Sequence, residues 1–349
     1  MTASAGTVSE PVAPPRPLRE RLRDAEPGIR LGAAGDAYLA EAPPAACQAE
    51  LAQLLADPNE DARKLAALAL GRIGPPAFSD LARALAAAQP AAVRALACIA
   101  AGAHGPAAAP LVAPLCTCLK APEEGVRSPA SIALGRVGAA AVGPLSRVLD
   151  ESNEAGTRIA AADAAGAIGK DAAPTSEGLR RASGHPDPRV GLACADALGR
   201  VSGRPASALP SLVTATHAAD EGLRAEAVRR IGTLQRDGHG AGKTLLALGG
   251  DPSPKVRAAS AIALALVGVR GDDLLSVLGR LLDDPDPQVR VCAAAAACHV
   301  REEARPLLPK LEALRRGTEP AVAAAAGAAC DAITGKEPPK PPARITAAA

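Results

Sequence analysis

The chain has 349 residues, and 48% of them are apolar, yet it contains one Phe, one Tyr and no Trp. A conventional core of this size packs several large aromatic side chains, so the composition argues against such a core and favours many short helices rich in Ala and Leu. Lys and Arg total 39 against 37 for Asp and Glu, which argues against a dedicated nucleic-acid-binding protein, as does the near absence of rings that stack on bases.

The N-terminal sequence MTASAGTVSEPVAPP lacks the apolar stretch of a signal peptide. The sequence contains no run of 18 apolar residues, which is the length that would predict a membrane span. Eight Cys residues outside a short secreted framework indicate reduced thiols. The sequence therefore predicts a cytoplasmic protein with no membrane or nucleic-acid partner. We expect disordered tails at residues 1–16 and 336–349, on either side of a folded region at residues 17–335.

An internal repeat organises the folded region. The phrase DPxPxVR occurs at residues 251–257 and again at residues 284–290. The Arg of this phrase serves as the anchor position of a repeat register. Successive anchor positions are separated by 33, 31, 33, 31, 33, 33, 33, 33 and 33 residues. The anchors are Arg30, Arg63, Arg94, Arg127, Arg158, Gly191, Arg224, Arg257, Arg290 and Ala323.

Each repeat is predicted to form two helices joined by a turn. Apolar or small residues at −1, +3, +7 and +10 from the anchor lie on one helix face. Gly stands at +8 in six of the repeats, near the predicted helix end. Asp57, Asp251 and Asp284 are the predicted N-caps of helices that begin with Pro. Pro129 falls inside one such helix, which is predicted to start late, with Ser128 as its cap, or to kink.

The second helix of each repeat follows the turn. Examples are predicted at residues 78–87, 108–119, 208–217, 273–282 and 305–314. Two short helices bury too little apolar surface to fold alone, so the repeats must stack on one another. The sequence predicts an all-α superhelix, or α-solenoid, of about ten helical hairpins.

These motifs resemble HEAT repeats, and are most similar to the short variety called PBS-lyase HEAT-like repeats. The resemblance rests on the Asp-Pro-x-x-x-Val-Arg helix entry, the Ala-rich helix and the Leu-Gly-Arg-Ile-Gly type ending at residues 70–74 and 134–138, and it covers residues 18–334. It implies the solenoid fold. Because such repeats serve scaffolds, phycobilin lyases and a hydroxylase alike, it specifies no single function.

The resemblance also implies a polar ladder between repeats, formed by the anchor Arg and the Asp that opens the helix. Pairs six residues apart occur at Asp24/Arg30, Asp57/Arg63, Asp251/Arg257 and Asp284/Arg290. The ladder is predicted to be absent at Gly191 and Ala323, and incomplete where that Asp is missing. We assign a structural role to all eight arginines: Arg30, Arg63, Arg94, Arg127, Arg158, Arg224, Arg257 and Arg290.

The sequence contains no recognisable catalytic or metal-binding motif. The hydroxylase with this repeat binds iron through His-Glu pairs, and none of the five His residues here precedes a Glu. Residues 236–244 resemble a phosphate loop, but Asp237 stands where the pattern requires Gly. Cys116 and Cys118 are spaced as C-x-C and point apart on a helix. We expect no catalytic residue, metal or cofactor.

A partner-binding surface is suggested by the register, because positions +2, +5 and +9 point away from the core. In HEAT-like solenoids the Asp-Pro helix lines the concave face, so these positions are expected to face the groove. The hypothesis is an apolar strip in the N-terminal half and a charged cluster near the middle, which together hold an extended peptide or helix of a partner. The residues are Leu68, Ile99, Ile132, Asp163, Asp196, Arg200, Glu226 and Arg229. The alternative is a solvated face whose charges pair among themselves.

The sequence therefore predicts a non-catalytic protein–protein interaction scaffold, acting as a monomer in the cytoplasm. Two alternatives stay open. One is a phycobilin-lyase-like or chaperone-like helper in cofactor attachment, which predicts a spectral shift on adding bilin. The other is a metal-dependent hydroxylase.

Overall fold

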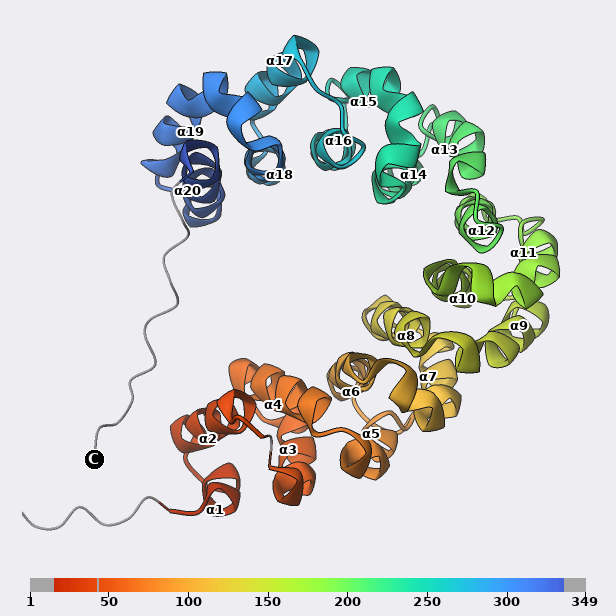
Figure 1. Cartoon of the computed structure of the whole chain (residues 1–349), viewed down its shortest axis with the longest axis vertical. Coiled ribbons are helices and arrows are strands. Elements are labelled where there is room, and N and C mark those ends of the chain that lie inside the picture. The colour runs from red at the N-terminus through yellow and green to blue at the C-terminus, as the bar shows by residue number, and fades with distance from the viewer. Residues whose placement is uncertain (1–15, 43, 336–349) are drawn as a thin grey trace, which may run out of the picture. The chain divides into compact units, whose positions relative to one another are not determined.

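Twenty α-helices and no strand are found in the part of the chain that the computed structural model describes, residues 16–42 and 44–335. The chain divides into two compact units, of which unit 1 ends at Ile168 and unit 2 begins at Gly169. Each unit is an α-solenoid of stacked helical hairpins (Figure 1). The predicted all-α superhelical fold is confirmed. The predicted tails lie outside the described residues, apart from Arg16, which forms an ion pair with Asp24 at 2.6 Å.

Long and short helices alternate along the chain and form two layers in each unit (Figure 1). The long-helix layer of unit 1 consists of α2 (Pro27–Leu39), α4 (Glu60–Ile73), α6 (Ala91–Ala103), α8 (Glu124–Val137) and α10 (Ala155–Ile168). Its short-helix layer consists of α1 (Leu18–Leu22), α3 (Gln48–Gln53), α5 (Phe78–Ala84), α7 (Val112–Leu119) and α9 (Val142–Glu151).

Unit 2 repeats this arrangement. Its long helices are α12 (Pro188–Val201), α14 (Glu221–Thr233), α16 (Pro254–Leu266), α18 (Pro287–Val300) and α20 (Pro320–Thr334). Its short helices are α11 (Ser176–Ala182), α13 (Leu209–Ala215), α15 (Gly242–Leu248), α17 (Asp272–Leu281) and α19 (Leu308–Arg315).

The long helices begin two residues later than predicted. The N-cap of α4 is Asn59, whose side chain accepts hydrogen bonds from two backbone amides, and the N-cap of α18 is Asp286. In α16 and α18 the second proline of the DPxP phrase is the first helical residue, and the first proline lies in the preceding turn. Asp57, Asp251 and Asp284 are therefore not N-caps. A proline at the first helical position is favoured because its fixed φ suits the helix and its missing N–H is not needed there.

The predicted late start of the helix around Pro129 is wrong. Helix α8 begins at Glu124, five residues before the proline, and runs to Val137. Pro129 lies inside the helix and removes one intrahelical donor, so the packing of the neighbouring repeats outweighs the cost of this proline.

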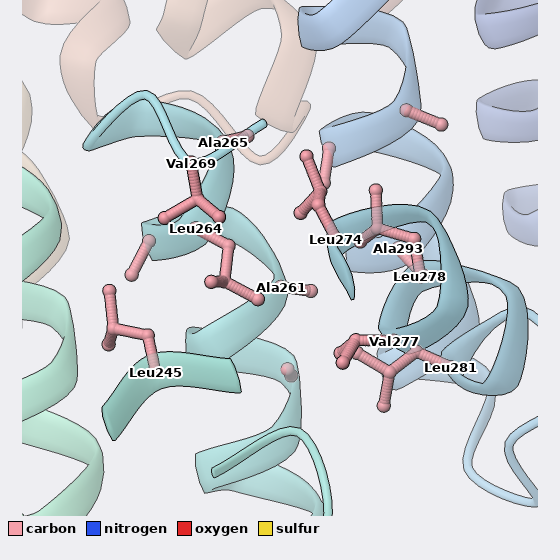
Figure 2. Close-up of a cluster of buried hydrophobic side chains, with 14 of the residues drawn as sticks. Leu245, Ala261, Leu264, Ala265, Val269, Leu274, Val277, Leu278, Leu281 and Ala293 are labelled. Atoms are coloured by element: carbon pink, nitrogen blue, oxygen red, sulfur yellow. The ribbon is translucent and has the colours of Figure 1, made fainter. Parts of the chain in front are cut away.

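The core lies between the two layers and consists almost entirely of Ala, Leu and Val side chains. In unit 2, side chains from α15, α16, α17 and α18 converge on one another, including Leu245, Leu264, Leu274 and Leu278 (Figure 2). Each of these four leucines is fully buried. Because every hairpin shares its core with the next one, its stability depends on its neighbours.

The glycine at +8 sets the close approach of successive long helices. A Cβ built on Gly102 of α6 would lie 3.0 Å from the Cα of Ala133 in α8. A Cβ on Gly232 of α14 would lie 3.2 Å from the Cα of Ala263 in α16. The facing residue is in both cases the Ala at +6 of the next repeat. A glycine against an alanine therefore allows the two backbones to approach closely.

The anchor arginines connect each repeat to the next, but through different partners from those predicted. In Arg257, Nε and Nη2 donate to the two carboxylate oxygens of Asp284 at 2.7 and 2.8 Å, 27 residues ahead. Its Nη1 donates to the carbonyl oxygens of Asp251 and Pro252 at 2.9 and 3.1 Å. Asp251, six residues before Arg257, thus contributes its carbonyl oxygen to Arg257. The carboxylate of Asp251 instead accepts a hydrogen bond from the backbone amide of Ser253 and faces the preceding repeat.

This geometry corrects the prediction of where the ladder is complete. The ladder was predicted to be incomplete at Arg224, but Arg224 binds Asp251 of the next repeat at 2.9 Å. The ladder was predicted to be complete at Arg63, but in the hydrogen bonds the structure shows, Arg63 binds only the carbonyls of Asp57 and Pro58. Carboxylate rungs join Arg30 to Asp57, Arg94 to Glu123, Arg224 to Asp251, Arg257 to Asp284 and Arg290 to Glu319. The carbonyl six residues back is bound by Arg30, Arg63, Arg127, Arg158, Arg224, Arg257 and Arg290.

The ladder predicts a loss of stability in acid. The hydrogen bond from Arg257 holds the pKa of Asp284 below its usual range. Burial alone raises the pKa of Asp57 and Asp251, but hydrogen bonds from arginine and backbone amides outweigh it, so both pKa values are lowered. Ionised carboxylates therefore stabilise the fold above the unfolded-state pKa of about 3.9, and this contribution is lost as the pH falls towards the lower folded values.

We expect the free energy of unfolding in urea to change little between about pH 7 and 5 and to fall below about pH 4. The difference between the wild type and Asp284→Asn isolates one rung, and it should shrink as the pH falls through this range. A difference that stays constant down to about pH 2 would contradict a role for the ionised carboxylate.

Candidate protein-binding surface

An exposed apolar strip runs across three neighbouring long helices of unit 1. Leu68 of α4, Ile99 of α6 and Ile132 of α8 occupy the same register position on helices that pack side by side. Their exposed fractions are 44%, 45% and 54%, whereas most large apolar side chains of the unit are buried. We call these three residues the apolar strip. The structure brings them together at the positions the register predicted.

Leu39, at the end of α2, is the most exposed large apolar residue of the described chain, at 73%. Leu39 was not among the predicted site residues. It stands nine residues after Arg30, at position +9 of the register. The same position holds Arg72 in the repeat of Arg63 and Arg136 in the repeat of Arg127. The same register reading applied to the first repeat would have found it.

The basic residues beside the strip differ in their contacts. The guanidinium of Arg72 lies over the ring of Tyr38, 5.8 Å from its centroid, and donates to the carbonyl oxygen of Tyr38. Arg136, next to the strip on α8, is exposed and has no ion-pair or hydrogen-bond partner within the described ranges. Arg136 therefore adds a free positive charge to the edge of the strip.

The predicted charged cluster is split between the two units and is largely paired within itself. Asp163 lies half-buried on α10 in unit 1, whereas Asp196, Arg200, Glu226 and Arg229 lie on α12 and α14 in unit 2. Arg200 Nε donates to Asp196 at 3.0 Å, and Arg229 Nη2 donates to Glu226 at 2.6 Å. Desolvation raises the pKa of Glu226, but the neighbouring arginines outweigh it, so its pKa is lowered.

Arg230, which the sequence analysis missed, links the members of this cluster. It is buried on α14 and forms ion pairs with Glu226 at 2.8 Å and with Asp196 of α12 at 3.4 Å. It stands at +6 of its repeat, where the other long helices from α4 to α20 carry Ala. A large charged side chain at this position is incompatible with the close Gly–Ala approach, so ion pairs take the place of that contact between α12 and α14. These acids are therefore less available to a partner than the strip is.

Metal and thiol chemistry gain little support from the geometry. No group of three or more His, Cys, Asp or Glu able to hold a metal ion occurs among the described residues. All eight cysteines are free thiols, and five of them are buried. Burial raises the pKa of Cys116 to about 11, so that thiol stays protonated at neutral pH.

The phosphate-loop-like segment, residues 236–244, spans the 3₁₀ turn Gln235–Ala241 that follows α14 and the first three residues of α15. A phosphate loop follows a strand, and here the preceding element is a helix. The segment serves as the connection between the two helices of a hairpin.

One helical run, Glu124–Glu151, is long and apolar enough by length and composition to cross a membrane, and 44% of its apolar 18-residue window is buried within the fold. It consists of α8 and α9, separated by Gly138, whose φ is +78°. The two parts have 14 and 10 residues, and a bilayer requires about 20 residues in one straight helix. This run is therefore the two layers of one repeat.

Comparison with known families gives one match. The family model of HEAT repeats matches residues 15–102 and 242–331, which together make up half of the chain. No curated protein matches the sequence.

The chain is also similar to solved structures at low sequence identity. The complex of CpcE and CpcF of phycocyanin lyase from Nostoc sp. PCC7120 aligns with a TM-score of 0.45 and 22% identity, over 66% of this chain and 92% of that one. The karyopherin Kap121p, solved with the extreme C-terminus of the protein phosphatase Cdc14p, aligns with a TM-score of 0.44 and 14% identity. That alignment covers 90% of this chain and 41% of the karyopherin chain.

Proposed function

The chain belongs to the HEAT-repeat family, and from that premise we propose that it is a non-catalytic scaffold that binds a segment of a partner protein on the apolar strip. The observation that carries the proposal is the exposure of Leu68, Ile99 and Ile132 on three adjacent helices. A monomeric, soluble chain rarely exposes large apolar residues in a row, and such rows mark interaction sites. A cytoplasmic location and a monomeric state remain predictions of the sequence.

The strip supports binding better than the charged cluster does. Burying three large aliphatic side chains gives a favourable free energy that scales with the apolar area removed from water. The charges of the cluster already have partners, so a ligand would have to replace ion pairs that exist in the free protein. In the proposal the cluster therefore supports the fold, and the strip makes the contact.

The test is an affinity purification that compares the wild type with Ile99→Asp plus Ile132→Asp. Because both side chains are exposed, we expect the unfolding midpoint to stay near that of the wild type while partner recovery falls at least tenfold. Leu266→Asp is the matched control, since Leu266 is also an exposed leucine on a long helix but lies in unit 2. Equal recovery by the double variant and the wild type would refute the proposal.

A further inference from the structure

A cavity of about 390 Å³ lies in unit 1 between α3 and α5. Its walls include four alanines, Ala49, Ala52, Ala56 and Ala84, together with Val93 of α6. Its polar lining consists of Asp80, Arg83, Gln53 and Gln89. Asp80 is only 4% exposed, whereas both glutamines and Arg83 are exposed at the rim. The cavity is thus a small, mostly apolar space with one buried carboxylate.

The repeat preceding this one carries a buried acid at the same position. Glu50 comes directly before the buried Leu51 in α3, as Asp80 comes directly before the buried Leu81 in α5. Glu50 is 1% exposed. The two acids therefore occupy equivalent places, each facing the short helix of the preceding hairpin.

At the first of these interfaces two arginines, Arg19 in α1 and Arg23 directly after it, pair with one oxygen of the acid. Arg19 Nε lies 2.8 Å from Glu50 Oε1, and Arg23 Nη2 lies 2.5 Å from the same oxygen. Both guanidinium groups approach from solvent, because the two arginine side chains remain more than half exposed. A buried carboxylate is stable in the folded protein when it is paired in this way.

At the second interface the corresponding arginines are missing. Thirty-three residues after Arg19 and Arg23, the repeat register places Ala52 and Ala56, and both line the cavity. Ala84 also stands where the preceding repeat has the larger Leu54. Within the described residues the ion-pair partner of Asp80 is Arg83, three residues on in its own helix, with a side chain that is 76% exposed. The cavity therefore occupies the space that guanidinium side chains fill one repeat earlier.

We propose that this cavity is a binding site for a guanidinium or ammonium group on an alkyl stem, such as the side chain of an arginine or lysine from a partner protein. The alkyl stem would lie against the alanines and Val93, and the charged group would pair with Asp80, with the amide oxygens of Gln53 and Gln89 as further acceptors. The cavity volume lies within the range of small-ligand sites, about 300–1,000 Å³. Arg83 competes only weakly, because its own side chain is 76% exposed and an ion pair with a solvated guanidinium contributes little. The site is separate from the apolar strip.

The probe is N-acetyl-arginine methylamide, and the matched control is N-acetyl-citrulline methylamide, which has nearly the same shape without the charge. Binding is followed by NMR of the full-length protein labelled at alanine methyl groups, since alanines form the walls. We expect saturable shifts of Ala52 and Ala84 with the arginine compound and none with citrulline. Free L-arginine is a further arm: weaker binding than the blocked compound indicates a peptide side chain, and equal or tighter binding indicates a free small molecule. Equal shifts with arginine and citrulline would overturn the proposal.

Three single variants and one double variant separate the site from a general structural effect. Asp80→Asn should weaken binding at least tenfold, and Arg83→Ala should strengthen it several-fold by removing the competing cation. Ala52→Arg, which restores the arginine of the preceding repeat, should abolish binding and raise the unfolding temperature, and this rise should vanish in an Ala52→Arg plus Asp80→Asn double variant. Unchanged affinity in Asp80→Asn, or an equal effect of Ala52→Arg with and without Asp80, would contradict the proposal.

Discussion

Replacing Gly102 by leucine is expected to lower the free energy of unfolding by about 3 kcal/mol, because the site is overpacked. Gly102 is buried where α6 meets α8, and even a single Cβ there would lie 3.0 Å from the Cα of Ala133 and 3.2 Å from its Cβ. Backbone and Cβ atoms cannot rotate away, so the two helices must separate. That separation also weakens the core packing shared by the two hairpins.

Urea unfolding followed by circular dichroism measures this effect. Gly32→Ala in α2 is the control, because nothing lies within 4 Å of a Cβ at that position. It removes a helix-interior glycine without a clash and should stabilise the protein by about 0.4–1 kcal/mol. The two substitutions should change the free energy of unfolding in opposite directions. This difference tests whether the glycine at +8 is required for the close contact between helices. A stability of Gly102→Leu close to that of the wild type would contradict the close approach of α6 and α8.

Removing one guanidinium from the ladder is expected to have an effect of similar size. Arg257→Ala leaves the buried Asp284 without its bidentate partner and removes the donor to the carbonyls of Asp251 and Pro252. Breaking a buried ion pair by removing one member costs about 3–5 kcal/mol, because the remaining charge is uncompensated. Arg257→Lys keeps the charge but not the fork of donors, so it should fall between Arg257→Ala and the wild type.

A double-mutant cycle with Asp284→Asn gives the interaction itself. The combined variant should be less destabilised than the sum of the two single variants, with a coupling of about 1–3 kcal/mol. Simple additivity would show that Arg257 acts through the carbonyls of its own repeat, and that the forward rung contributes nothing.

The fold was predictable from the sequence because its cause is repeated ten times in it. Arg anchors, Ala at +3 and Gly at +8 each report the same local geometry, so the error at any one repeat is averaged out. Helix starts were less predictable, since DPxP offers two prolines and two candidate caps, the Asp before the first proline and Ser253 or Asp286 after it. The choice depends on the carboxylate of Asp251 or Asp284, which is held by the preceding repeat's arginine and is not available as a cap.

The surface was predictable where it follows the register and unpredictable where it departs from it. Leu68, Ile99 and Ile132 are exposed because position +5 points away from both layers. Arg230 was missed because a charge at the +6 position, otherwise alanine, is buried only when acids from two helices converge on it. The cavity beside Asp80 was missed because it arises where the equivalents of Arg19 and Arg23 are absent. That absence can be recognised only once the structure shows that these two arginines pair with Glu50.

Site-specific photocrosslinking tests most directly whether the protein works by holding a partner on the apolar strip. A benzophenone amino acid at Ile99 is compared with the same group at Arg147, an exposed position on α9 of the short-helix layer. The account predicts that irradiation at Ile99 attaches one recurrent protein, and that Ile132→Asp in the same chain abolishes the product. Equal crosslinking from Arg147, or a product at Ile99 that survives Ile132→Asp unchanged, would contradict it.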